Sequence, residues 1–252
     1  MITNRQVKII NSLQRKKFRK EYQSFIVQGT KSVLELLSFS TLDIDLLLVT
    51  EEFKTLHHVL IEKSNSQELA VVTISELEKL GTFETNSSAL AVVRMPEKID
   101  FTYEKGEYVL VLDDIRDPGN LGTILRIADW YGIKKVLCST ETVDVYNPKV
   151  IAATMGSFSR VTIFYEDLKE VLTQYKGEFI VAAYLEGESI YKMNSGNKGG
   201  FIIIGNESKG VSEELMSCVS NKVTIPRIGG AESLNAGIAT AIFCDNIIGR
   251  NA

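Results

Sequence analysis

The chain has 252 residues, of which 44% are hydrophobic and 24% charged, and its formal net charge is −4 at pH 7. That length is sufficient for two domains, each with its own core. No stretch approaches the roughly 18 consecutive apolar residues of a membrane span, and the charged first 20 residues do not form a signal peptide, so we expect a cytoplasmic protein without a membrane segment.

The first 20 residues concentrate positive charge, with seven Lys and Arg residues and no acid. A solvated helix face is one explanation of such a run. Like charges on one helix repel each other unless an anion neutralises them, so contact with RNA phosphates is the other. Both explanations stay open at this point. The candidate RNA-binding residues are Arg15, Lys16, Lys17, Arg19 and Lys20.

Short apolar runs alternate with helical patterns in the N-terminal part of the chain. We predict strands over 25–28, 45–49, 70–74 and 89–93, and helices over the basic segment, over 30–38, near 54–63 and after Ser75. This pattern predicts a small α/β domain over residues 1–95. A polar segment with Pro96 and Gly106 follows, which predicts an exposed linker over residues 96–107.

The remainder, residues 108–252, also alternates strands with helices. We predict a strand, a loop and a helix within 108–132, strands over 135–138, 161–164, 179–183, 201–204 and 222–225, and helices near 148–155 and 167–175. Strands joined through helices form a parallel sheet with right-handed crossovers. The fold class expected for this half is therefore α/β.

Three of these strands are each followed by a polar, glycine-containing segment and then by a helical pattern. These loops are expected over 117–120, from Gly205 and over 226–232, and the helices are expected from Asn120 as N-cap, from about Ser212, and over 233–248. Loops at the carboxyl ends of neighbouring parallel strands form a crevice. We therefore expect a ligand site there.

Two familiar nucleotide sites do not fit this crevice. Gly205 and Gly210 have the glycine spacing of a P-loop, but Val211 and Ser212 follow where Lys and Ser or Thr are needed. The fingerprint G-x-G-x-x-G of dinucleotide-binding proteins does not occur in the chain. Ordinary turn chemistry remains an alternative for any single one of these loops.

The cysteines and histidines do not indicate a metal site. Cys138, Cys218 and Cys244 lie in apolar stretches without C-x-x-C spacing, which predicts reduced thiols in the core. His57 and His58 are adjacent and lack spaced partners, which favours surface residues over ligands. We expect no metal.

Taken together, three segments resemble the signature motifs of the SpoU (TrmH-type) family of RNA ribose 2′-O-methyltransferases, part of the SPOUT superfamily. In chain order they are N-L-G-T-I-L-R over 120–126, I-G-N-E-S-K-G over 204–210 and I-P-R-I-G-G-A-E-S-L-N over 225–235. The N-terminal half resembles the family's substrate-binding domain more loosely, since Gln28 stands where the family usually has Glu.

The resemblance implies a domain layout. Residues 1–95 would bind the RNA substrate with a fold shared with ribosomal proteins that bind kinked RNA, residues 96–107 would be the linker, and residues 108–252 would form a methyltransferase domain with a deep trefoil knot.

The resemblance also implies S-adenosylmethionine as cofactor. The methyl group on its sulfonium is already electrophilic, so the protein must align the ribose hydroxyl and assist loss of its proton, without a metal.

The resemblance further implies where the cofactor binds. Main-chain groups near Gly205, Ile225 and Leu234 would hold the adenine side, and Asn206 and Glu207 would lie near the methionine end. The other implied cofactor-binding residues are Gly210, Pro226 and Asn235. A loop that offers its main chain to a ligand cannot carry bulky side chains at the point of approach, which would explain the glycines.

Among the implied catalytic residues, Arg126 is the family's leading candidate for activating the ribose hydroxyl. A guanidinium does not give up its proton, so we expect it to orient the adjacent phosphate and stabilise the developing alkoxide. An ordinary helix arginine paired with Asp129 is the alternative. The other implied catalytic residues are Asn120, Glu207, Ser233 and Asn235, and the last two would also begin the final helix.

The final helix carries Ala236, Gly237, Ala239 and Ala241, a small-residue surface that favours close approach of another backbone. We expect a homodimer through the C-terminal domain, with packing inside the chain as the alternative. The expected substrate is large-subunit ribosomal RNA (rRNA), with tRNA as the alternative. A non-catalytic RNA-binding SPOUT protein and a base-methylating SPOUT enzyme are the remaining alternatives, but all five candidate catalytic residues are present.

Overall fold

The computed structural model describes residues 2–81, 86–193, 196 and 199–251. The chain forms two compact units, Met1–Lys98 together with Asp144–Arg160, and Ile99–Val143 together with Val161–Ala252. Residues 144–160, which we expected within the C-terminal domain, therefore pack with the first unit. None of the helices in the described ranges has the length and apolar character needed to cross a membrane.

The first unit is built on a four-stranded mixed sheet. Its strands are β1 (Ser24–Gln28), β2 (Ile44–Val49), β3 (Leu69–Val71) and β4 (Ala89–Arg94), in the order β1-β4-β2-β3. Its helices are α1 (Asn4–Ser12), α2 (Lys16–Tyr22), α3 (Thr30–Phe39), α4 (Glu51–Leu56), α5 (His58–Lys63), α6 (Ile74–Glu78), α8 (Pro148–Thr154) and the 3-10 turn η1 (Ser157–Ser159). All four predicted strands are present.

Alternation along the strands gives this sheet two apolar faces. Along β4, Ala91 and Val93 join one core, and Leu90 and Val92 join the other. The first core also contains Ile151 and Phe158 from the 144–160 segment. This packing explains why that segment folds with the first unit.

The basic N-terminal segment is two helices, although one was expected. A capping box at Thr3 begins α1, which ends at Ser12, and α2 begins at Lys16. The break leaves the carbonyl groups of Leu13 and Gln14 without helical partners. Nη1 of Arg19 donates to both, at 2.9 Å each, which stabilises the break.

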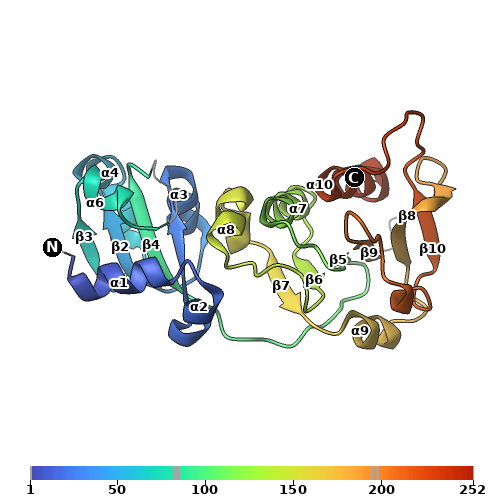
Figure 1. The fold of residues 1–252 in the computed structure, drawn as a ribbon, viewed down its shortest axis with the longest axis horizontal. Coiled ribbons are helices and arrows are strands. Elements are labelled where there is room, and N and C mark those ends of the chain that lie inside the picture. The colour runs from blue at the N-terminus through green and yellow to red at the C-terminus, as the bar shows by residue number, and fades with distance from the viewer. Residues whose placement is uncertain (1, 82–85, 194–195, 197–198, 252) are drawn as a thin grey trace. The chain divides into compact units, whose positions relative to one another are not determined.

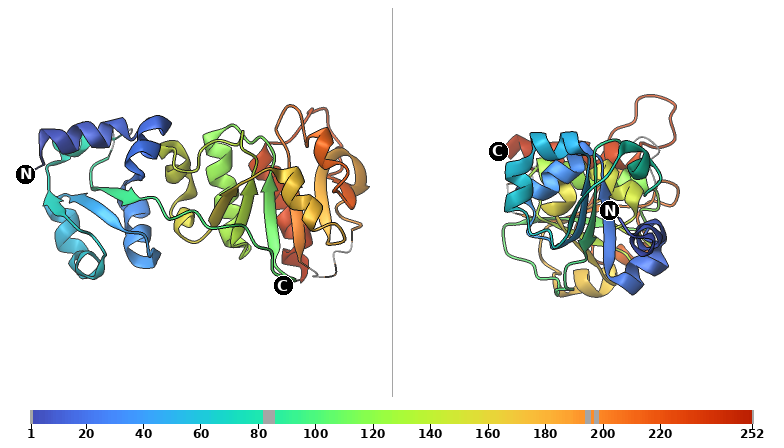
Figure 2. Two further views of the ribbon diagram at one scale, coloured as in Figure 1. Left: turned by 90° about the horizontal axis from the view of Figure 1, so that it is seen from below. Right: turned by 90° about the vertical axis from the view of Figure 1, so that its left-hand side faces the viewer.

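The second unit contains a six-stranded, wholly parallel sheet, as predicted. Its strands are β5 (Tyr108–Leu112), β6 (Lys135–Cys138), β7 (Thr162–Tyr165), β8 (Ile180–Ser189), β9 (Gly200–Ile204) and β10 (Asn221–Thr224), in the order β10-β8-β9-β5-β6-β7. Its helical elements are α7 (Pro118–Trp130), α9 (Leu168–Gln174), α10 (Ala236–Ile247), η2 (Glu213–Leu215) and η3 (Gly249–Asn251). Helices α7 and α10 lie on one side of this sheet and α9 on the other (Figures 1 and 2).

Strand register decides which loops meet at the carboxyl edge of this sheet. The central strands β5 and β9 are neighbours, with Leu112 opposite Ile204. The residues that follow, Asp113 and Gly205, therefore leave the sheet side by side. This edge is where the three predicted loops converge.

All three cysteines are free and buried, as the apolar stretches around them predicted. Burial raises the pKa of Cys138, and it raises the pKa of Cys244 to about 12. The Cys138 and Cys244 thiols therefore remain protonated at neutral pH, which suits packing and not nucleophilic chemistry.

Candidate active site

Three side chains from distant parts of the sequence form one hydrogen-bonded joint. Asn120 of α7 donates from Nδ2 to Oε1 of Glu207, in the loop after β9. Its Oδ1 accepts from Nδ2 of Asn235, at the start of α10, at 2.8 Å. The structure thus brings together one residue from each of the three sequence motifs.

The N-cap of α7 is Asp117, and the expectation that Asn120 fills this role is wrong. Oδ1 of Asp117 accepts from the main-chain N of Asn120 at 2.8 Å, and Pro118 occupies the first turn, where its missing N–H costs nothing. Asn120 is the third residue of the helix, within its first turn. Its side chain is therefore free to join Glu207 to Asn235.

Asn235 is the N-cap of α10, which begins at Ala236 and not at Ser233. Oδ1 of Asn235 accepts from the main-chain N of Gly237 at 3.0 Å and of Ile238 at 3.4 Å. Its Nδ2 is left to donate to Asn120. One amide therefore both caps the helix and ties it to α7.

Ser233, expected beside these residues, is exposed and forms no hydrogen bond with the described part of the chain. The structure therefore does not bring it into the joint. The helix expected from Ser212 is only the short turn η2.

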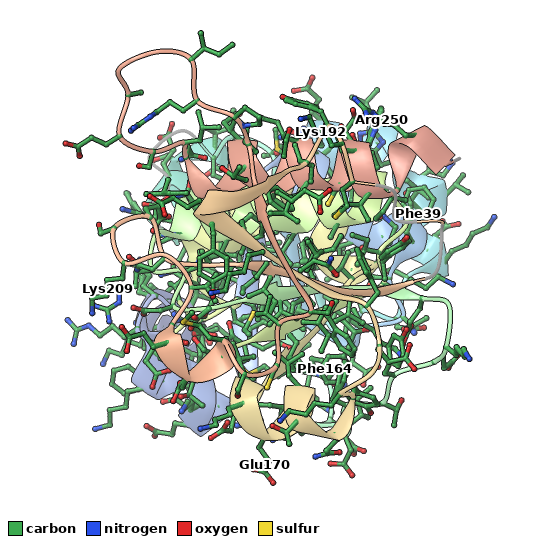
Figure 3. The ribbon with its side chains drawn as sticks, turned by 90° about the vertical axis from the view of Figure 1, so that its right-hand side faces the viewer. Phe39, Phe164, Glu170, Lys192, Lys209 and Arg250 are labelled. Carbon is green, nitrogen blue, oxygen red and sulfur yellow. The ribbon has the colours of Figure 1, made fainter. Side chains whose placement is uncertain are left out.

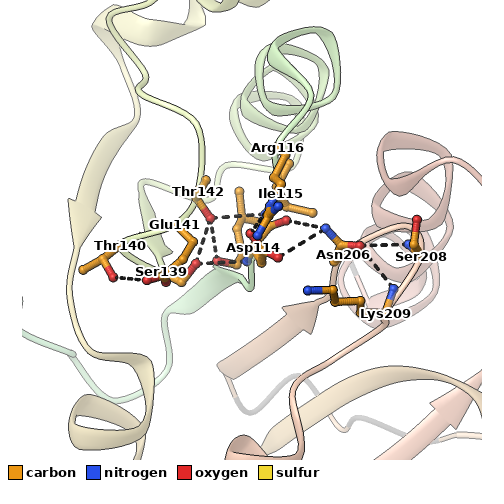
Figure 4. A network of polar contacts seen from close by, with 11 residues as sticks. Asp114, Ile115, Arg116, Ser139, Thr140, Glu141, Thr142, Asn206, Ser208 and Lys209 are labelled. Carbon is orange, nitrogen blue, oxygen red and sulfur yellow. Dashed lines mark hydrogen bonds and ion pairs between the residues drawn. The ribbon is translucent and has the colours of Figure 1, made fainter. Parts of the chain in front are cut away.

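The loop between β9 and η2, residues 205–211, is closed on itself. The main chains of Asn206 and Gly210 exchange two hydrogen bonds of 3.0 and 2.9 Å. Oδ1 of Asn206 accepts from the main-chain N of Ser208 and of Lys209, and its Nδ2 donates to the main-chain O of Asp114 at 2.8 Å (Figure 4). Asn206 thus braces the loop from within, and Lys209 projects at its margin (Figure 3).

The structure gives a reason for glycine at position 205 that differs from the one expected. A Cβ at this position would overlap Gly210 and the main-chain N of Val211, so the loop's own turn requires glycine there. Gly210 has a φ of +70°, which also favours glycine, and a Cβ there would meet nothing within 4 Å. The loop's own main chain is therefore sufficient to require glycine at position 205.

The segment between β10 and α10 projects as an open loop (Figures 1 and 3). Residues 226–234, all described, are exposed, and their one hydrogen bond joins Nη1 of Arg227 to the main-chain O of Ala231 at 3.4 Å. Leu234 is 45% exposed, and Ile228 is exposed completely. This loop therefore offers unused main-chain groups and apolar side chains to a ligand.

Arg126 is not part of the hydrogen-bonded joint. It lies six residues after Asn120, a rotation of about 240° around the helix, so the two side chains leave α7 in different directions. Arg126 is exposed and forms no ion pair within the described ranges, so the alternative of a pair with Asp129 is not realised. Its guanidinium is available to a group outside this chain.

The first unit carries the predicted basic residues, and one of them is placed differently. Arg15, Lys16, Lys17 and Lys20 are exposed. Arg19 is 2% exposed, and its Nη2 lies 2.6 Å from Oδ2 of Asp144. Because its guanidinium is buried and bonded to Asp144, Leu13 and Gln14, Arg19 is not available to an RNA phosphate, and that expectation is corrected.

Several polar residues that support the site were not identified from the sequence. Asp113 and Asp114 follow β5, and Ser139 and Thr142 follow β6. Oγ of Ser139 accepts from the main-chain N of Asp114 at 2.9 Å, and Oγ1 of Thr142 donates to the main-chain O of Leu112 at 3.2 Å (Figure 4). The sequence feature that could have identified them is their position directly after buried strands, where polar residues face the ligand-binding edge of a parallel sheet.

Comparison with known sequences gives two matches to family models. Residues 107–245 match the SpoU rRNA Methylase family, and residues 4–91 match the MRM3-like substrate binding domain. The curated relatives include 23S rRNA (guanosine(2553)-2′-O)-methyltransferase RlmP of Bacillus subtilis, which is 27% identical over 98% of this chain and 97% of that protein. Human mitochondrial rRNA methyltransferase 3 is 22% identical over 90% of this chain and 67% of its own length.

Solved structures agree with these matches. A structure from Porphyromonas gingivalis described as a member of the TrmH family has a TM-score of 0.85 and 31% identity, covering 99% of both chains. An rRNA methyltransferase from Sinorhizobium meliloti with bound S-adenosylmethionine has a TM-score of 0.87 and 27% identity, covering 100% of this chain and 97% of that one.

Proposed function

The chain belongs to the SpoU rRNA methylase family, and we propose that it transfers a methyl group from S-adenosylmethionine to a ribose 2′-hydroxyl of large-subunit rRNA. The observation that carries the proposal is the joint of Glu207, Asn120 and Asn235 at the carboxyl edge of the parallel sheet. It links one residue from each family motif at the edge where α/β proteins bind ligands. The names of the relatives support rRNA as the substrate.

The cofactor site is proposed between the 205–211 loop and the 226–234 loop. The open loop fits the adenine side, because it combines partly exposed Leu234 with main-chain groups of which, among the described residues, only the O of Ala231 accepts a hydrogen bond. Glu207 supplies a negative charge that suits the ammonium group of the methionine end. The proposed cofactor-binding residues are Gly205, Asn206, Glu207, Gly210, Ile225, Pro226, Leu234 and Asn235.

The candidate catalytic residues have different roles in the proposed reaction. The bound cofactor supplies an electrophilic methyl group. Asn120 holds the Glu207 carboxylate in one orientation, and Asn235 fixes the amide of Asn120. Arg126 binds a substrate phosphate beside the reacting ribose and stabilises the charge that develops on the 2′-oxygen. Ser233, exposed on the open loop, is proposed to contact the ribose or its phosphate.

The second unit is proposed to form the family's trefoil knot and a homodimer. Helices α7 and α10 pack closely, since a Cβ on Gly237 would lie 3.0 Å from Cγ2 of Thr123. Their outer surface includes Trp130, 85% exposed, and Ile238, 53% exposed. Exposed apolar groups of this size favour a protein partner, and a second copy would also bring its own Arg126 to this surface.

Recognition of rRNA is proposed to lie in the N-terminal domain, residues 1–95, joined by the linker 96–107 to the methyltransferase domain, residues 108–252. The match to a substrate binding domain and the exposed basic residues of α2 support this division. The 144–160 segment would add to the substrate-binding side, because it shares that unit's core. Since rRNA and S-adenosylmethionine are both found inside cells, the proposal implies a cytoplasmic enzyme.

The experiment that tests this function compares ribose methylation across rRNA and tRNA from cells with and without the gene. We expect one 2′-O-methylated nucleotide of large-subunit rRNA to disappear in the deletion strain. Loss of a tRNA ribose methylation would instead support the tRNA alternative. An unchanged pattern in both RNAs would support the non-catalytic alternative.

A further inference from the structure

Asp113 contacts both ends of the 205–211 loop. Its main-chain N donates to the main-chain O of Ile204, where the loop begins, at 2.9 Å. Its Oδ2 accepts from the main-chain N of Ser212, where the loop ends, at 2.7 Å. Asp113 is only 7% exposed, although it carries an acidic side chain. Burial of a carboxylate costs free energy unless hydrogen bonds compensate for the lost contact with water.

The two ends of the loop are held in different ways. The entry is part of the β5–β9 ladder, so side-chain changes at position 113 leave it in place. The exit lies outside any strand, and there Val211 packs into the core of the second unit. Apolar packing is not directional, whereas a short hydrogen bond to a carboxylate fixes both distance and direction.

The loop is braced as one unit, because hydrogen bonds close it on itself. Asn206 and Gly210 are joined by two main-chain hydrogen bonds, and Asn206 caps the turn between them. Glu207 lies inside this closed turn. A shift of the exit at Ser212 would therefore carry the Glu207 carboxylate away from Asn120.

From this arrangement we infer that Asp113 is a positioning residue of the methyl-transfer site: its carboxylate sets the 205–211 loop in the place where Glu207 meets Asn120. This inference rests on the proposed function, because it assigns Asp113 to the cofactor-binding loop. Asp113 acts through Ser212 and the loop.

The test uses the full chain with three substitutions and one control. Asp113→Ala removes the acceptor, Asp113→Asn keeps a side-chain oxygen that can accept, and Ser212→Pro removes the donor at a φ of −61° that proline adopts. Asp167→Ala is the control, because Oδ1 of Asp167 accepts a main-chain hydrogen bond from Glu170 at 2.9 Å at the start of α9, outside the loop. The measurements are calorimetric affinity for S-adenosylmethionine and hydrogen–deuterium exchange in peptides that cover residues 205–212.

We expect Asp113→Ala and Ser212→Pro to weaken cofactor binding by about tenfold, the effect of one lost directional hydrogen bond. Hydrogen–deuterium exchange in residues 205–212 should become faster in both variants. Asp113→Asn should stay within about threefold of the wild type, because its oxygen still accepts. Asp167→Ala should change neither measurement.

Three outcomes would overturn the inference. They are unchanged binding and exchange in Asp113→Ala, a loss in Asp113→Asn equal to that in Asp113→Ala, and an equal loss in Asp167→Ala. If Asp113→Ala does not fold, Ser212→Pro decides by the same two measurements. If the wild type itself does not bind S-adenosylmethionine, the proposed function fails, and exchange in residues 205–212 still decides the role of Asp113.

Discussion

Asn120 donates a hydrogen bond to Glu207 across 87 residues of sequence, and this contact joins the first helix of the methyltransferase motifs to the loop after β9. Asn235 completes the joint from the third motif. An amide is suited to the central place, because it donates to a carboxylate and accepts from another amide at the same time. The joint therefore fixes three loops relative to one another at the edge of one sheet.

Replacing Asn120 with alanine removes both side-chain hydrogen bonds of the joint. We expect methyl transfer to fall by about 100-fold, because the Glu207 carboxylate loses its fixed orientation. The free energy of unfolding should change by only about 1 kcal/mol, since Asp117 still caps α7. Methyl-transfer assays and denaturant unfolding measure the two quantities. Asn221→Ala, at the amino end of β10, is the matched control, and an equal loss of activity in that variant would count against the joint.

Replacing Arg126 with alanine should leave affinity for S-adenosylmethionine nearly unchanged and lower the rate of methyl transfer by about 100-fold, as expected for a group that acts in the transition state. The exposed guanidinium has no ion pair within the described structure, so its removal costs little stability. Arg126→Lys should recover little activity, because an ammonium lacks the planar fork that binds two oxygens. Full activity of Arg126→Lys in a single-turnover assay would exclude this role.

Replacing Arg15, Lys16 and Lys17 with glutamate should weaken RNA binding and reduce its dependence on salt. The slope of log affinity against log salt should fall by up to about 3 if all three contact phosphates, at roughly 0.7 to 0.9 for each lost contact. Affinity for S-adenosylmethionine should not change. Filter binding over a range of salt concentrations gives the slope, and an unchanged slope would show that these residues do not contact RNA.

Arg19→Gln is the matched control for this basic segment. It should lower the melting temperature and leave the salt slope nearly unchanged, because Arg19 is buried against Asp144 and does not face solvent. A lower salt slope with an unchanged melting temperature would show instead that Arg19 contacts RNA.

How much the sequence could predict depended on the range of the interactions involved. The strands were predictable because apolar runs and turn residues are local, and β6 and β9 lie within a residue of where they were expected. The break between α1 and α2 was not predictable, because it depends on Arg19 turning inward towards carbonyl groups and Asp144. The capping role of Asp117 was missed because Asn120 is an equally good N-cap residue by type.

The candidate site was predicted as a set of residues and not as an arrangement. The family motifs pointed to Asn120, Glu207 and Asn235, but their contacts depend on sheet register, which no local pattern contains. Gly205 was predicted from the motif, but the obstacle that the loop's own main chain presents to a side chain there could not be predicted.

Replacing Trp130 with glutamate should convert the proposed homodimer into a monomer. The indole is 85% exposed on α7, and a charge in the middle of an apolar interface is costly to bury. Light scattering should return about twice the 28.0 kDa chain mass for the wild type and the single-chain mass for the variant. A wild-type mass near 28.0 kDa at working concentration would contradict the homodimer.

The most direct measurement incubates the purified chain with unmodified large-subunit rRNA and methyl-labelled S-adenosylmethionine, then digests the RNA to nucleosides for mass spectrometry. We predict that the label appears in a single 2′-O-methylated nucleoside. We also predict that Asn120→Ala and Arg126→Ala each reduce the label. Label in a base-methylated nucleoside, or no label with folded protein that binds both RNA and cofactor, would contradict the proposed function.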